Sequence, residues 1–218
     1  MDYLPLPFRE SLARRQAELV FPALRAEMAA KKRGLMANRM PLAPAHGNLA
    51  HPSVHVFVDD QNLFWGITND KYGKGYRLDF GRLLVESVRD EKGRARPVGS
   101  AYIAGVIPDD DYFWEVARKQ GFEVRRGFLG SKHRSKQDDA YLITEITSTL
   151  YEKPGPATIV LVAGDADYMP PLQKAISKGW RVEVVFIGHS VSSALDPVTH
   201  KFQELDPVGV QRYQNFPI

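Results

Sequence analysis

Aspartates follow two strongly apolar segments of the chain, in a pattern that suits the binding of a divalent cation. The segment 54–58 (VHVFV) leads into Asp59, and the segment 158–163 (TIVLVA) leads into Asp165 and Asp167. A carboxylate at the end of a buried segment is costly unless its charge is compensated. Mg²⁺ prefers oxygen ligands and usually takes one or two carboxylates with water. These aspartates predict a cation site if the two segment ends are neighbours; otherwise they are structural acids, and Asp167 alone suits a helix cap.

A third acidic position lies at the start of a helical pattern over residues 137–151. Asp138 and Asp139 fall in its first turn, where the helix dipole favours acids in any case. Glu145 lies six residues after Asp139, which is not the same helix face. A run of cations lies before this segment, and it suits either a phosphate backbone that approaches a metal or a surface loop that balances nearby acids. The run consists of Arg125, Arg126, Lys132, His133, Arg134 and Lys136.

The elements that must position these residues alternate regularly from residue 53 onward. Short apolar segments predict strands, and longer amphipathic segments predict helices. We expect strands at 54–58, 98–104, 122–128, 158–163, 181–187 and near 202–205, and helices at 78–89, 109–120, 137–151 and 167–178. This order predicts an α/β fold, a Rossmann-like three-layer sandwich with a mostly parallel sheet of five or six strands. Ligands of such sheets bind at the carboxyl ends of the strands, where the aspartates fall.

Residues 1–52 form a separate region with a basic composition. They carry eight Lys and Arg against four acids, whereas the rest of the chain is close to neutral. The spacing predicts a helix over 8–33 and a proline-rich linker over 38–52. This extension is either a basic arm for a polyanion or a helix that packs on the domain or on a second subunit in a homodimer. Leu12 and Leu19 favour packing. The main domain would span 53–206, with 207–218 as a tail.

The overall composition narrows the class of protein. The chain has 44% hydrophobic residues and no cysteine, which excludes disulfides and thiolate zinc sites. The apolar runs are too short to cross a bilayer, and the first residues do not follow the pattern of a secretory signal. We therefore expect a cytoplasmic protein without a membrane partner.

Several motifs, in this order, resemble the NYN domain, a PIN-like group of metal-dependent ribonucleases. FVDDQNL at 57–63 resembles the opening strand of the family, and KQDDAYLITE at 136–145 resembles its Lys-x-x-Asp helix. VAGDADY at 162–168 resembles its Ser-Gly-Asp-x-Asp-Phe segment, and FQEL at 202–205 resembles its closing segment. Asp60, Ala163 and His200 depart from the usual Gly, Ser and Asp, and none of them removes a core acid.

The resemblance implies a ribonuclease that hydrolyses phosphodiester bonds of single-stranded RNA with Mg²⁺ or Mn²⁺. Asn62 would position a water or a phosphate oxygen, or else cap the short helix after the first strand. Tyr168, with Phe64 and Trp65, would either stack on single-stranded bases or pack in the core or at its rim. The implied metal ligands are Asp59, Asp139, Asp165, Asp167 and Glu145, and the implied phosphate contacts are Lys136, Arg134, Lys132 and Arg126.

Two other functions compete with the ribonuclease. The same fold can bind RNA or a protein without turnover, as a catalytically silent module. A phosphatase of the haloacid dehalogenase type is a third reading, but it needs a second Asp two residues after the first. Gln61 stands there, two residues after Asp59, which argues against it.

Overall fold

The computed structural model describes residues 53–68, 76–106, 112–129, 135–136 and 138–212. The extension 1–52, for which we predict a basic helix and a role in dimerisation, lies outside the described residues. Residues 207–212 pack against the domain: the backbone N–H of Asp79 donates to the carbonyl of Val210 (2.9 Å), and the Tyr76 hydroxyl donates to the carbonyl of Pro207 (2.6 Å). Of the predicted tail, residues 207–212 therefore belong to the folded body.

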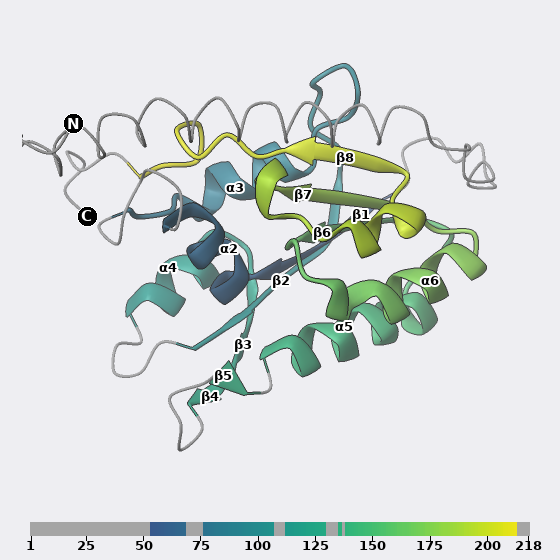
Figure 1. The fold of residues 1–218 in the computed structure, drawn as a ribbon, viewed down its shortest axis with the longest axis horizontal. Coiled ribbons are helices and arrows are strands. Elements are labelled where there is room, and N and C mark those ends of the chain that lie inside the picture. Colours follow the sequence, from purple (N-terminus) through teal and green to yellow (C-terminus); the bar gives the residue numbers. More distant parts are fainter. Residues whose placement is uncertain (1–52, 69–75, 107–111, 130–134, 137, 213–218) are drawn as a thin grey trace, which may run out of the picture. The chain divides into compact units, whose positions relative to one another are not determined.

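Six parallel strands form the central sheet, in the order β3-β2-β1-β6-β7-β8 (Figure 1). Every residue of the two central strands is buried, because both faces of the sheet are covered. The α/β fold with a parallel sheet is thereby confirmed. The strands are β1 Val54–Asp59, β2 Val98–Gly105, β3 Glu123–Arg126, β6 Thr158–Val162, β7 Arg181–Phe186 and β8 Lys201–Glu204.

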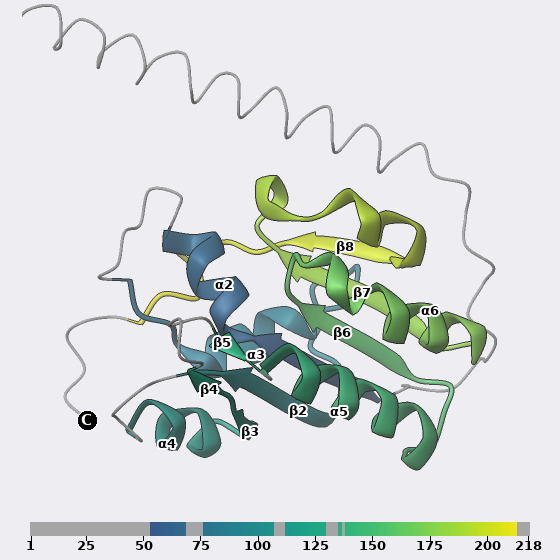
Figure 2. The same cartoon turned by 60° about the horizontal axis from the view of Figure 1, so that its bottom comes forward.

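Helices cover both faces of this sheet. Helices α5 and α6 lie side by side on one face, while α3 and α4 pack together on the other (Figures 1 and 2). The helices are α2 Asp60–Ile67, α3 Phe80–Ser87, α4 Tyr112–Lys119, α5 Asp138–Glu152 and α6 Met169–Ser177. In the part of the chain that the structure describes, no helix has the length and apolar character to cross a membrane.

The helix predicted at 167–178 is divided in two. A 3-10 turn, η2 Ala166–Tyr168, precedes α6 because Pro170 and Pro171 follow Met169. Proline has no backbone N–H and is tolerated only in the first turn of an α-helix, so α6 cannot begin much earlier. The helix predicted at 78–89 is confirmed as the shorter α3, and its N-cap is Asp79, whose side chain accepts from the backbone N–H of Arg82 (3.0 Å).

The strand predicted at 122–128 is shorter than expected. It leaves the main sheet after Arg126, and the chain then forms a separate antiparallel pair, β4 Phe128–Leu129 with β5 Ser135–Lys136. Strands of two residues have no hydrophobic alternation, so the sequence pattern does not reveal them. Two further 3-10 segments, η3 Gly188–Ser190 and η4 Ser193–Val198, join β7 to β8.

The strand order reverses between β1 and β6. From β1 the chain builds β2 and β3 outward in one direction, then returns to place β6, β7 and β8 on the other side of β1. Such a reversal is a topological switch point, where the connections leave the sheet in opposite directions and open a crevice at the carboxyl ends. Asp59 ends β1 and Asp165 follows β6, so both border this crevice.

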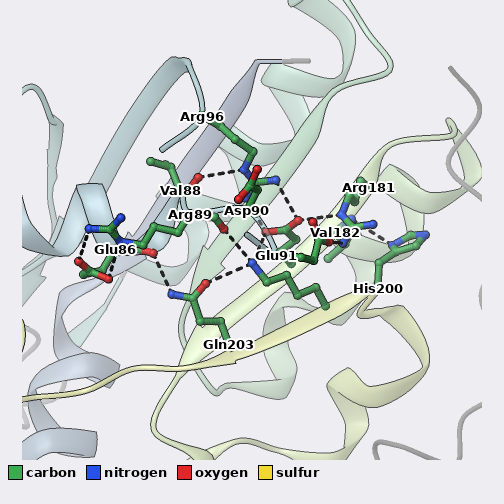
Figure 3. Close-up of polar contacts among 12 residues, drawn as sticks. Glu86, Val88, Arg89, Asp90, Glu91, Arg96, Arg181, Val182, His200 and Gln203 are labelled. Carbon is green, nitrogen blue, oxygen red and sulfur yellow. Dashed lines mark hydrogen bonds and ion pairs between the residues drawn. The ribbon is translucent and has the colours of Figure 1, made fainter. Parts of the chain in front are cut away.

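At the opposite, amino edge of the sheet, the buried carboxylate of Glu183 holds three cations. Glu183 is 2% exposed; Arg96 donates to its two oxygens (3.0 and 2.6 Å), and Arg181 donates through Nε (2.7 Å). The third cation is Lys201, whose Nζ lies 3.8 Å from Oε2 of Glu183. Figure 3 shows how this network joins the loop before β2 to β7 and β8. Burial would raise the pKa of Glu183, but Arg96, Arg181 and Lys201 lower it below its ordinary value.

Candidate metal centre

Asp59 joins the first strand to the helix that follows it. It is the last residue of β1 and the N-cap of α2, and its Oδ1 accepts from the backbone N–H of Asn62 (2.9 Å). Aspartate is a favoured N-cap because its oxygen satisfies an otherwise unpaired helix N–H. The side chain is 2% exposed. The apolar strand and the cap together fix one carboxylate at the carboxyl edge of the sheet.

The side chain of Asn62 forms a hydrogen bond across the switch point. Its side-chain Oδ1 accepts from the backbone N–H of Gly164 (2.8 Å), which follows β6. This bond ties the first turn of α2 to the loop that carries Asp165. The oxygen of Asn62 is therefore used structurally, and its amide N–H groups are the part that can donate to a ligand.

The Tyr168 hydroxyl brings two of the predicted acids together. It lies 2.9 Å from Asp59 Oδ2 and 3.2 Å from Asp139 Oδ1, so residues from β1, η2 and α5 meet at one oxygen. Tyr168 is fully buried. Burial, followed by the charges of Asp59 and Asp139, raises its pKa far above the ordinary value, so the hydroxyl keeps its proton and donates it.

The remaining two aspartates lie at the start of the η2 turn, after β6. Asp165 is half-buried, and its Oδ1 accepts from the backbone N–H of Asp167 (3.0 Å), as the N-cap of η2. Asp167 is exposed. Among the described residues, no three His, Asp or Glu side chains gather closely enough to hold a cation by themselves. The structure thus brings Asp59 and Asp139 to one hydroxyl, whereas Asp165 and Asp167 belong to the η2 turn and its cap.

The donor set of this pair fits a hard cation. A phenol has one proton, so the Tyr168 hydroxyl can hydrogen-bond fully to one carboxylate at a time. The two carboxylates that converge on this hydroxyl present several oxygen atoms at one place. Mg²⁺ is commonly bound by one or two carboxylates, with water or phosphate oxygens completing the octahedron. Asp59 and Asp139 satisfy that requirement with oxygen ligands alone.

Glu145 has a cation partner of its own. It lies further along α5, and its carboxylate accepts from Nε of Arg125 (2.5 Å) at the carboxyl end of β3. The structure therefore places it in an ion pair rather than at the Tyr168 hydroxyl. Of the predicted phosphate contacts, Arg126 is exposed at the end of β3. Lys132 and Arg134 lie outside the described residues, and of Lys136 only the backbone, in β5, is described.

The structure decides between the two predicted roles of Tyr168. Tyr168 cannot stack on a base, because its ring is part of the hydrophobic core. Its hydroxyl contacts the acids instead, at a position where the family motif has Phe; that extra oxygen is the sequence signal that was missed. His200 lies at the amino edge, where its Nδ1 accepts from the backbone N–H of Val182 (3.1 Å), so it does not belong to the site.

Asp60 turns away from its neighbour Asp59. It is 7% exposed and packs against the end of β2. A Cβ at Gly105 would lie 2.8 Å from the Cβ of Asp60, so this close approach requires glycine. The two consecutive acids therefore serve different sides of α2.

A parallel sheet with helices on both faces is typical of α/β proteins that bind ligands at the carboxyl ends of their strands. The family model described as "NYN domain" matches residues 53–206, which is most of the chain. The chain belongs to the NYN domain family, within the PIN-like nuclease superfamily.

One of two similar solved structures supports the fold. A crystal structure of a protein of unknown function from Vibrio parahaemolyticus superposes with a TM-score of 0.58 at 16% identity, covering 76% of this chain and 100% of that chain. The aureusimine biosynthetic cluster reductase domain aligns with a TM-score of 0.27 at 11% identity, covering 74% of this chain and 39% of that chain. No curated protein matches the sequence.

Proposed function

We propose that this protein is a metal-dependent ribonuclease that hydrolyses phosphodiester bonds of single-stranded RNA. One observation supports this most: Asp59 and Asp139, from elements far apart in the sequence, converge on the Tyr168 hydroxyl at the switch point of the sheet. The membership of a nuclease-type family supports the same class of reaction.

Each group of residues has a different role in the proposed reaction. Asp59 and Asp139 would hold Mg²⁺ or Mn²⁺, with Asp165 and Asp167 at the η2 turn. The bound ion would supply the Lewis acidity that activates water and stabilises charge on phosphorus. The Asn62 amide would donate to a phosphate oxygen or to the attacking water. Cations would neutralise the neighbouring phosphates of the RNA and set its register; they are Arg126, Lys132, Arg134 and Lys136.

Removal of the divalent cation tests the proposal. We expect the purified protein to cleave a fluorescently labelled single-stranded RNA in the presence of Mn²⁺ or Mg²⁺. EDTA should abolish cleavage, and excess Mn²⁺ should restore it, because the proposed mechanism needs the bound cation to lower the pKa of the attacking water and to stabilise charge on phosphorus. Cleavage that proceeds unchanged in EDTA, or its absence with every divalent cation, contradicts the proposal.

A catalytically silent RNA-binding module is the second candidate. The observation that favours it is the extra oxygen of Tyr168, which already bridges the two acids where the family motif has Phe. Filter binding of RNA across a salt series separates the two candidates. Retention of RNA in EDTA, with a steep salt dependence and no product after long incubation, supports the module over the enzyme.

A further inference from the structure

A cavity of about 340 Å³ lies on the side of α2 that faces away from the acidic pair. That volume falls within the range of small-ligand pockets, roughly 300–1,000 Å³. Three aromatic side chains line the cavity, together with a carboxylate, an amide and a guanidinium. They are Phe64, Tyr76, Phe113, Asp60, Gln61 and Arg77. Neither the metal chemistry nor the phosphate contacts proposed above use this cavity.

We propose that this cavity binds one unstacked nucleobase of the RNA. Aromatic walls suit a flat π-system, because stacking of a base on an aromatic ring is favourable and every base has a π-face. Acceptors and donors at the same cavity suit the edge of a base, which carries both kinds of group.

The walls of the cavity are held firmly. Phe113 packs edge-on against Phe80 and Trp114, with ring centroids 4.9 and 4.8 Å apart. The Gln61 amide donates to the carbonyl of Val106 (3.1 Å), and the Tyr76 hydroxyl is fixed on Pro207. The aromatic faces are therefore positioned before a ligand arrives, which lowers the entropy lost on binding.

The cavity adjoins the proposed metal centre through two consecutive residues. Asp59 points to Tyr168 and Asp139, whereas Asp60 lines the cavity and packs against Gly105. Consecutive α-carbons are about 3.8 Å apart, so both sites lie at the same turn of backbone. A nucleotide whose phosphate reaches Asp59 can place its base beside Asp60. This inference rests on the proposed function for the identity of the ligand.

Binding of single nucleosides tests the inference without any cleavage. Adenosine, guanosine, cytidine and uridine would each be titrated into the full-length protein in EDTA, with line broadening and saturation-transfer NMR as the readout. We expect saturable binding of at least one nucleoside. Phe64→Leu keeps the apolar bulk and removes the ring, and it should weaken that binding by roughly 5- to 150-fold, the range that stacking implies.

A matched control keeps the result interpretable. Tyr151→Leu makes a comparable change at an exposed aromatic residue near the far end of α5, and it should leave nucleoside binding unchanged. Thermal melting of each variant shows whether it is folded. Absence of binding by all four nucleosides, or equal affinity in Phe64→Leu and wild type, overturns the inference.

The inference and the proposed function can fail separately. Nucleoside binding that depends on Phe64, in a protein that never cleaves RNA, supports the pocket and removes the ribonuclease. Metal-dependent cleavage by a protein that binds no nucleoside supports the ribonuclease and removes the pocket.

Discussion

Asp59→Asn will reduce metal-dependent RNA cleavage by roughly 100- to 1,000-fold, the range seen when one preorganised electrostatic group is removed from an active site. The substitution is nearly isosteric, and asparagine is as good an N-cap as aspartate, so α2 keeps its first-turn hydrogen bond. What it loses is the negative charge beside Tyr168 and Asp139. Initial rates of single-stranded RNA cleavage in Mn²⁺ measure the effect.

The chain offers a closely matched control for this variant. Asp79 is also the N-cap of a helix, and its Oδ1 accepts from the backbone N–H of Arg82 at 3.0 Å. Asp79→Asn makes the same chemical change away from the acidic pair, and we expect it to retain wild-type rates. Equal rates in Asp59→Asn and Asp79→Asn would show that Asp59 has only a capping role.

Glu183→Gln will destabilise the fold by about 3 kcal/mol, the lower end of the range for breaking a buried ion pair. The side chain keeps its size, so no cavity forms, but Arg96 and Arg181 lose the charge that compensates them. The lower end applies because the cations reach solvent in part; the Arg181 side chain is 33% exposed. Urea unfolding at pH 7 measures the difference, with Glu115→Gln, which breaks an exposed pair with Arg118, as a control without measurable change.

The same network predicts a pH dependence of stability. The pKa of Glu183 is lower in the folded protein than in the unfolded chain, so its contribution is fully present above the ordinary glutamate pKa, about 4.3. The contribution is lost as the pH falls below that value, toward the lowered pKa of the folded state. The gap in free energy of unfolding between wild type and Glu183→Gln should therefore narrow under acid. A gap that stays constant from pH 7 into that range contradicts the role of charge.

The parts of the fold that depend on local pattern could be predicted from the sequence. The runs at 54–58 and 158–163 are apolar throughout, and that is typical of central strands covered on both faces. The aspartates after these runs fall at the carboxyl edge for the same reason. Asp79 could be identified as a cap from its place before an amphipathic segment.

The meeting of Asp139 with Asp59 could not be predicted from local pattern. The first turn of any helix favours acids, so Asp139 needs no partner to explain it. Its approach to Asp59 depends on the crossover from β3 through α5 to β6, which is a property of the topology. Only the resemblance of the ordered motifs indicated that Asp139 belonged to the site.

The contact of the Tyr168 hydroxyl with the two acids could not be predicted from the sequence. Whether an aromatic residue after a strand is buried depends on the geometry of the turn that carries it. In DADYMPP, the two prolines delay α6 and leave Tyr168 in a 3-10 turn whose ring enters the core. From the sequence, an aromatic residue beside two aspartates looks like a rim residue that is available to RNA. The structure directs its hydroxyl inward to the acids.

Anomalous diffraction from a crystal soaked in Mn²⁺ tests the central claim most directly, because it locates the cation without reference to activity. The convergence of Asp59 and Asp139 predicts an anomalous peak in contact with both carboxylates, next to the Tyr168 hydroxyl. A peak elsewhere, or no peak at a Mn²⁺ concentration that supports cleavage, would contradict the assignment of these acids as the metal centre.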